Sequence, residues 1–267
     1  MLYYSNAKIN LGLNIIEKRK DGFHNLETVF YPIAVKDAME FIPSDKVDLS
    51  NSGISVDCNL EDNLIIKAYR LLQSDFDLPT LKFHLHKTIP SGAGLGGGSA
   101  NAVYTLMELN RFYKLDLSKS KLQDYASRLG SDCAFFIDNT SLFATGKGDV
   151  FQDVKLDLSG FHILLIHPNF AVSTIEAYSN VVPKQPSKSL LDIVNQPIDT
   201  WQTEMINDFE ESVFKKYPLL SDIKTKLYRE GAVYASMSGS GSSIFGIFRA
   251  QPNTDDFSEY WTWTGLL

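Results

Sequence analysis

A glycine-rich segment constrains this chain more than any other feature of its sequence. Residues 92–98 read Gly-Ala-Gly-Leu-Gly-Gly-Gly, so five of the seven are glycine. Glycine adopts left-handed backbone conformations, and its missing side chain lets backbone N–H groups approach an anion closely. A flexible surface turn rarely needs five glycines. The segment therefore predicts a phosphate-binding loop.

The flanking segments place this loop between a strand and a helix. Residues 81–87 alternate apolar and polar side chains, which is typical of a strand. Residues 99–113 carry Val103 and Leu106 at helical spacing. The start of a helix offers a bound anion unpaired N–H groups and a favourable dipole.

Two other phosphate-binding loops do not fit the sequence. A P-loop ends in Gly-Lys-Ser or Gly-Lys-Thr, whereas here Ser99 follows Gly98 directly. The spacing of Gly92, Gly94 and Gly97 matches the dinucleotide fingerprint, and Asp116 lies about 20 residues further on. However, Asp116 leads into a helix and does not end a second parallel strand. The dinucleotide interpretation fails on this context.

The remaining periodicity indicates an α+β protein. Near the N-terminus, residues 9–15 alternate as in a half-buried strand, and a Lys-Asp-Gly turn at 20–22 leads to a second strand at 24–33. Further strands are expected at 141–151 (a hairpin), 161–166, 232–237 and 243–249, and helices at 63–74, 118–130, around 207–210 and at 218–230. We expect two domains, residues 1–155 and 156–267.

Composition narrows the functional classes. The net charge of −7 argues against a general nucleic-acid binder, which would normally show a basic excess. No secretory signal and no long apolar run is visible, so we expect a cytoplasmic protein without a membrane partner. Cys58 and Cys133 lack metal-site spacing, and His84-x-His86 has no third ligand nearby, so no metal-ligating residue is predicted.

Three segments together resemble the GHMP kinase family, which includes galactokinase and the homoserine and mevalonate kinases. They are residues 90–101 around the glycine loop, Ala7-Lys8-Ile9-Asn10-Leu11, and Met237-Ser238-Gly239-Ser240-Gly241-Ser242-Ser243. The resemblance implies an N-terminal ATP-binding domain with a left-handed β-α-β unit and a C-terminal α/β sandwich-like domain. It also implies ATP and Mg²⁺ as cofactors.

Within the family, the chain resembles most the members that phosphorylate 4-diphosphocytidyl-2-C-methyl-D-erythritol. The segments that carry this resemblance are residues 20–26, 61–65, 130–132 and 207–210. It implies transfer of the ATP γ-phosphoryl group to the 2-hydroxyl of a CDP-linked methylerythritol, in non-mevalonate isoprenoid precursor biosynthesis. Two alternatives stay open: another GHMP small-molecule kinase of the mevalonate or homoserine type, and a nucleotide-binding regulator without turnover.

The resemblance assigns catalysis to Lys8 and Asp132. A carboxylate just past a helix end is able to accept the hydroxyl proton, and a lysine ammonium is able to meet developing phosphate charge. Without the resemblance, a capping or surface role is the favoured interpretation of Asp132, and a solvated lysine on an edge strand is the alternative for Lys8. The cofactor-binding residues that the resemblance implies are Pro90, Ser91, Gly92, Ala93, Gly94, Leu95, Gly96, Gly97, Gly98, Ser99 and Asn63, with Lys87 a weaker candidate. Ser99 either reaches Mg²⁺ or phosphate, or only caps the helix.

The substrate side needs aromatic rings and hydrogen bonds to the edge of a base. The resemblance assigns Phe23 and Tyr178 to stacking on cytosine, His24 to its polar edge, and Asn10 to orienting the substrate. Ordinary packing is the alternative for each ring. The expected partner is a small molecule, and the expected assembly a monomer or a homodimer.

Overall fold

The chain forms two compact units that interleave along the sequence. The computed structural model describes all of residues 1–267. Unit 1 comprises Met1–Ala7, Val35–Ser91 and Gly96–Asn139, and unit 2 comprises Lys8–Ala34, Gly92–Leu95 and Thr140–Leu267. The predicted domain boundary between residues 155 and 156 stays a prediction, because each unit is a set of separate segments that pack together and not one continuous stretch of chain.

Two long paired strands supply both units with backbone: β1 (Leu2–Lys18) and β2 (His24–Pro43). The predicted turn between them is present, and Gly22 closes it with a hydrogen bond from its N–H to the Arg19 carbonyl. The prediction of a half-buried β1 was wrong. Lys8, Asn10 and Asn14 on its polar face are buried as well, because polar partners from distant segments surround them.

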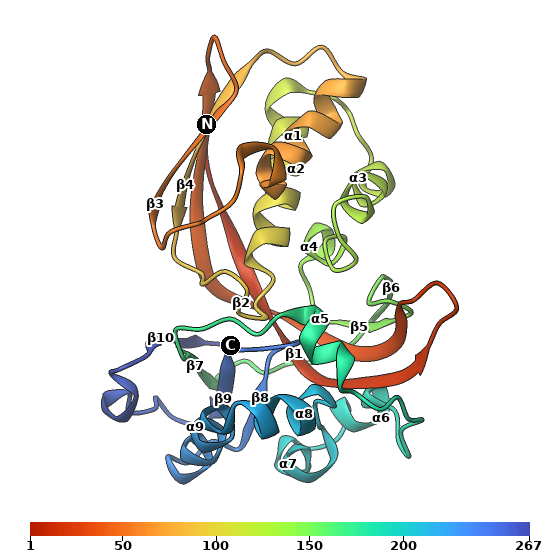
Figure 1. Cartoon of the computed structure of the whole chain (residues 1–267), viewed down its shortest axis with the longest axis vertical. Coiled ribbons are helices and arrows are strands. Elements are labelled where there is room, and N and C mark those ends of the chain that lie inside the picture. Colours follow the sequence, from red (N-terminus) through yellow and green to blue (C-terminus); the bar gives the residue numbers. More distant parts are fainter. The chain divides into compact units, whose positions relative to one another are not determined.

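Unit 1 packs four helices beside a small sheet (Figure 1). The C-terminal half of β2 pairs antiparallel with β4 (Leu81–Lys87), and β4 pairs in parallel with β3 (Asp48–Gly53). The chain from β3 to β4 passes through the 3₁₀ turn at Leu60–Asp62 and helix α1 (Leu64–Asp75), which makes a β-α-β unit. Helix α2 (Gly97–Tyr113) contacts α1, α3 (Lys119–Ser127) and α4 (Phe135–Asp138).

Two of the three helix starts predicted in unit 1, at residues 63 and 118, are confirmed by their capping bonds. Asn63 accepts from the Ile65 N–H over 2.9 Å at the start of α1, and Ser118 accepts from the Lys121 N–H over 3.3 Å at the start of α3. Each cap satisfies a backbone donor that has no partner inside the helix.

Unit 2 is built on a four-stranded antiparallel sheet. Its order is β10 (Trp261–Leu266), β7 (His162–His167), β9 (Ile244–Phe248) and β8 (Tyr234–Met237). The N-terminal half of β2 pairs with β5 (Leu142–Thr145), which pairs with β6 (Val150–Asp153). The helices are α5 (Thr174–Ser179), α6 (Leu190–Val194), α7 (Trp201–Glu204), α8 (Phe209–Lys216) and α9 (Pro218–Arg229), with 3₁₀ turns at Ile198–Thr200 and Asp255–Phe257.

The core of unit 2 explains where α8 and α9 lie. Helix α9 contacts β8 and β9, and Leu227 packs with Phe209 and Ile244 in one buried apolar cluster. The architecture is α+β, as predicted. None of the helices is both long and apolar enough to cross a bilayer.

Candidate active site

The glycine loop has a fixed conformation, unlike a free surface turn. Gly92, Gly94 and Gly96 have φ angles of 65°, 77° and 69°, in the left-handed region that favours glycine. Between them, the side chains of Ala93 and Leu95 are buried. The Ala93 carbonyl accepts from the Ser243 N–H and the Leu95 carbonyl from the Lys8 N–H, at 3.1 and 3.0 Å. Two buried side chains and two backbone hydrogen bonds therefore anchor the loop.

A second glycine-rich segment, residues 238–243, packs directly on the first one. The Ser238 hydroxyl donates to the Gly94 carbonyl over 2.9 Å. A Cβ atom on Gly94 would lie 1.9 Å from the Ser238 carbonyl oxygen, which no side chain tolerates. Only glycine at residue 94 allows this approach, which joins two segments 144 residues apart.

Helix α2 begins immediately after the loop, without a side-chain cap. Its N-cap residue is Gly96, and the first helical bond runs from the Ala100 N–H to the Gly96 carbonyl. The N–H groups of the first turn are then available to a ligand. Ser99 is the third helical residue and donates from its hydroxyl to Asp132 Oδ1 over 2.9 Å. The interpretation of Ser99 as a helix cap was therefore wrong, and its contact with metal or phosphate stays a prediction.

Asp132 lies half-buried in a turn between helices α3 and α4. The next strand along the chain, β5, begins only at Leu142. The neighbouring Cys133 is buried, and burial, with a smaller effect from Asp132, raises the pKa of its thiol to about 12. Cys133 is thus a protonated, unreactive neighbour of the candidate base.

Lys8 is buried on β1 and has a defined orientation. Its side chain is 4% exposed, so the interpretation as a solvated edge lysine was wrong. The ammonium donates to Asn10 Oδ1 over 2.6 Å and to the Gly94 carbonyl over 2.9 Å, and lies 5.3 Å from the centroid of the Phe30 ring. The charge is thus held next to the glycine loop.

Asn10 uses both ends of its amide inside the protein. Its oxygen accepts from Lys8, and its Nδ2 donates to the Thr28 hydroxyl over 2.9 Å. Thr28 in turn donates to the Gly12 carbonyl over 2.6 Å. In this structure Asn10 orients Lys8, and its predicted contact with substrate stays a prediction.

Lys87 and Asn63, the remaining ATP candidates, both have structural partners. Lys87 is buried in an ion pair with Asp37. Burial lowers the pKa of Lys87, and Asp37 opposes that effect. Asp37 also accepts from the Thr88 and Ile89 N–H groups just before the glycine loop, at 2.7 and 2.9 Å. Asn63 caps α1, so a role of either residue in ATP binding stays a prediction.

The predicted aromatic residues fall into one region of unit 2. The His24 and Tyr178 rings stack with their centroids 4.9 Å apart and their planes at 25°. Burial, and to a smaller degree Lys18, lowers the pKa of His24, which favours the neutral form of its ring. Phe23 is 54% exposed, and the Lys147 ammonium lies 4.9 Å from its ring centroid. In the sequence, only the family resemblance linked Tyr178 to Phe23 and His24.

The sequence did not predict that Lys147 lies next to Phe23. The structure places it at the tip of the β5–β6 hairpin, where the Gly146 carbonyl accepts from the Leu26 N–H over 2.9 Å. The available signal was the Gly-Lys-Gly-Asp turn at 146–149, which predicted the hairpin and not its neighbour.

Family models match most of this architecture. Residues 63–143 match the GHMP kinases N terminal domain, and residues 192–261 match the GHMP kinases C terminal domain. The chain belongs to the GHMP kinase family. The α+β fold in two parts is the fold of that family, as the resemblance implied.

Several similar proteins align with this chain over its whole length. A 4-diphosphocytidyl-2-C-methyl-D-erythritol kinase of Bacteroides thetaiotaomicron is 49% identical over 274 residues, covering 100% of both chains. One of Parabacteroides distasonis is 48% identical over 270 residues with the same coverage. A crystal structure of 4-(cytidine 5'-diphospho)-2C-methyl-D-erythritol kinase is 27% identical, with a TM-score of 0.79 over 99% of this chain and 98% of that one. The Methanococcus jannaschii mevalonate kinase shares the fold at 14% identity, with a TM-score of 0.71 over 100% and 98% of the two chains.

Proposed function

We propose that this GHMP kinase transfers the γ-phosphoryl group of ATP to the 2-hydroxyl of 4-diphosphocytidyl-2-C-methyl-D-erythritol. The observation that carries the proposal is the 49% identity, over full length, to a relative with that name. The aromatic region of unit 2 supports it, because mevalonate and homoserine have no base for such rings to bind. The reaction belongs to isoprenoid precursor biosynthesis, and the protein's place of action is the cytoplasm.

The ATP phosphates would bind at residues 90–99 and the start of α2. Loop glycines with fixed left-handed angles and the unpaired N–H groups of a helix start suit a polyanion. Mg²⁺ would fit the same end of the loop, because the Ser99 hydroxyl offers a hard oxygen donor of the kind that it prefers. When bound, Mg²⁺ neutralises phosphate charge.

The chemistry assigned to this chain's own residues is modest, because phosphoryl transfer needs mainly positioning and charge stabilisation. Asp132 would accept the proton of the attacking hydroxyl, and the hydrogen bond from Ser99 would fix the carboxylate for that task. Lys8, held by Asn10 and the Gly94 carbonyl, would stabilise the charge that develops on the transferred group.

Phe23, His24 and Tyr178 would bind the cytosine. Stacking of a base on an aromatic ring contributes about 1–3 kcal/mol. Phe23 is exposed and ready to stack, whereas Tyr178 already has His24 against it. A neutral His24 ring has one donor and one acceptor nitrogen, which suits the mixed polar edge of cytosine.

Product analysis tests this function directly. Purified protein is incubated with ATP, Mg²⁺ and the cytidylyl substrate, and the product is examined by mass spectrometry and ³¹P NMR. We expect one added phosphate, on the 2-hydroxyl. Phe23→Ala should raise KM for this substrate at least about 5-fold by loss of stacking and leave KM for ATP within about 2-fold. A phosphate at another position, or no product, would refute the proposal.

A further inference from the structure

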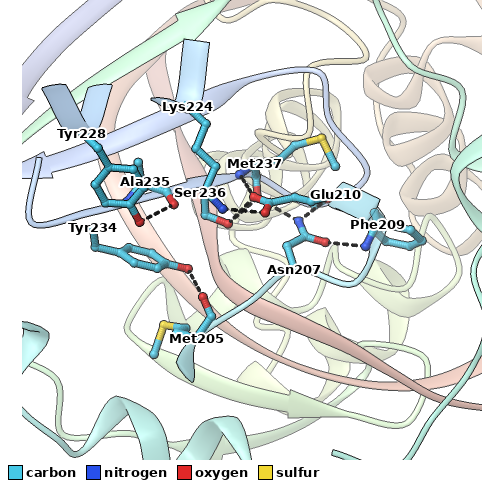
Figure 2. Close-up of polar contacts among 11 residues, drawn as sticks. Met205, Asn207, Phe209, Glu210, Lys224, Tyr228, Tyr234, Ala235, Ser236 and Met237 are labelled. Carbon is cyan, nitrogen blue, oxygen red and sulfur yellow. Dashed lines mark hydrogen bonds and ion pairs between the residues drawn. The ribbon is translucent and has the colours of Figure 1, made fainter. Parts of the chain in front are cut away.

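Asn207, just before helix α8, binds the second glycine-rich segment on both sides of Ser238. Its Nδ2 donates to the carbonyls of Met237 and Gly239, both at 2.8 Å, and its Oδ1 accepts from the Phe209 N–H at 3.0 Å. Figure 2 shows the side chain pointing at Met237 from the start of α8. The residue is 3% exposed, so these bonds have no competition from water.

Glu210 binds the backbone just before this segment. Its Oε1 accepts from the Met237 N–H over 2.8 Å and from the Ser236 hydroxyl over 3.0 Å. Its Oε2 pairs with the Lys224 ammonium over 2.6 Å (Figure 2). The backbone at Met237 is therefore bound through both its N–H and its carbonyl, and both bonds come from one turn of chain.

Ser238, between the two carbonyls that Asn207 binds, contacts the Gly94 carbonyl and the backbone of Asn10. Its hydroxyl donates to the Gly94 carbonyl over 2.9 Å and accepts from the Asn10 N–H over 3.3 Å. The Gly94 carbonyl and the Asn10 side-chain oxygen both accept from the Lys8 ammonium. Asn207 thus binds the backbone on both sides of Ser238, and the Ser238 hydroxyl shares the Gly94 carbonyl with the Lys8 ammonium.

We propose that Asn207 is a positioning residue for phosphoryl transfer: it fixes Ser238, whose hydroxyl binds the Gly94 carbonyl and the Asn10 backbone, and so helps to orient the Lys8 ammonium that Gly94 and Asn10 accept from. The inference rests on the proposed function, because it takes Lys8 as catalytic. An amide is required here, because only an NH₂ group donates to two carbonyls while the same side chain accepts from a third group. Misplacement of a catalytic group by about 1 Å costs on the order of 10²-fold in rate.

Asn207→Asp tests the proposal with the smallest change of shape. It keeps the acceptor for the Phe209 N–H and removes both donors to the carbonyls of Met237 and Gly239. We expect kcat to fall about 10- to 100-fold while KM for ATP and for the cytidylyl substrate changes less than about 3-fold. The matched control is Asn195→Asp, which removes one amide-to-carbonyl bond at an exposed residue of unit 2 and should leave kcat native.

A milder variant keeps the test valid if a buried carboxylate at residue 207 unfolds the protein. Ser238→Ala removes only the hydroxyl between Asn207 and the acceptors of Lys8. We expect the same loss of kcat with nearly constant KM values, at a native melting temperature. Loss of thermal stability with native kcat would mean a purely structural segment and would overturn the inference.

A double-mutant cycle asks whether the effect passes through Lys8. In a Lys8→Met background, Asn207→Asp and Ser238→Ala should each lower kcat by less than about 2-fold, since the group they position is gone. The same 10-fold loss in both backgrounds would contradict the inference and leave the proposed function intact. Native turnover of Lys8→Met alone would remove Lys8 from the proposed mechanism, and the inference with it.

Discussion

The Ser99 hydroxyl donates to the Asp132 carboxylate over 2.9 Å, although the two residues are 33 positions apart. This bond connects the first turn of α2, where the glycine loop ends, to the turn before α4. A residue next to the glycine loop therefore sets the orientation of the candidate base. Ser99 is the third residue of α2, whose N-cap is Gly96.

Ser99→Ala should lower activity without loosening the helix. A hydrogen bond to a charged group is worth about 1.5–3 kcal/mol, so we expect kcat to fall about 10-fold or more. The melting temperature should stay native, because the N-cap is residue 96. Ser120→Ala, at an exposed residue of α3, is the control. A lower melting temperature with native kcat would show that Ser99 serves only the fold.

Asp132→Asn should keep ATP and substrate binding and lower kcat at least about 10²-fold, the usual minimum for a general base. Lys8→Met should act similarly, because it removes the buried ammonium beside the glycine loop. Asp124→Asn, exposed on α3, controls for loss of a surface carboxylate. Steady-state kinetics and calorimetry separate turnover from binding. Near-native turnover of Asp132→Asn would exclude it as the base.

Two glycines of the same loop should respond in opposite ways to alanine. Gly94→Ala places a Cβ atom 1.9 Å from the Ser238 carbonyl at a φ of 77°, so we expect a loss of at least about 2 kcal/mol in unfolding free energy. At Gly98, inside α2, the nearest atom to a new Cβ is Leu64 Cδ1 at 3.7 Å. Gly98→Ala should therefore stabilise the protein by about 0.4–1 kcal/mol. Denaturant unfolding measures both, and equal effects would contradict the loop geometry.

His167 should make the fold sensitive to acid. It is 7% exposed, and burial lowers its pKa to about 4, whereas in the unfolded chain it titrates near 6.5. Between these values the unfolded state binds a proton that the folded state does not, so stability falls as pH falls from 6.5 to 4, by about 3 kcal/mol in full.

The comparison variant is His167→Asn, which keeps a polar group near the Ser242 hydroxyl, 3.2 Å from Nδ1 in the native protein. Its unfolding free energy at neutral pH should be lower, and its loss between pH 6.5 and 4 should be smaller than that of the native protein. An identical pH dependence of the two proteins would show that His167 is not the titrating group.

Local signals in the sequence predicted local structure well. Alternation gave β1 and β4, and Asn63 and Ser118 marked the first turns of α1 and α3. The strand at Asp48–Gly53 was missed, because its residues are mostly polar and it is held by parallel pairing with β4 rather than by propensity.

The periodicity of the sequence did not predict contacts between residues far apart in the chain. The polar face of β1 looked solvated, yet Asn10 binds Ser238, 228 residues away, and Lys8 binds Gly94, 86 residues away. Asn207 stood out in the sequence only as part of a family resemblance. Its two bonds to the backbone of residues 237–239 became visible only in the folded structure. Buried polar residues need partners, but the sequence does not say which ones.

Acceptor specificity tests the central claim most directly. The native protein is assayed for ADP release, at saturating ATP, with the cytidylyl substrate, its uridine analogue, mevalonate and homoserine. A site that binds the polar edge of cytosine leaves a buried group unpaired with uracil, so kcat/KM for the cytidylyl substrate should exceed that for each alternative by at least about 10²-fold. Equal turnover of the cytidine and uridine forms, or rapid phosphorylation of mevalonate or homoserine, would contradict the account.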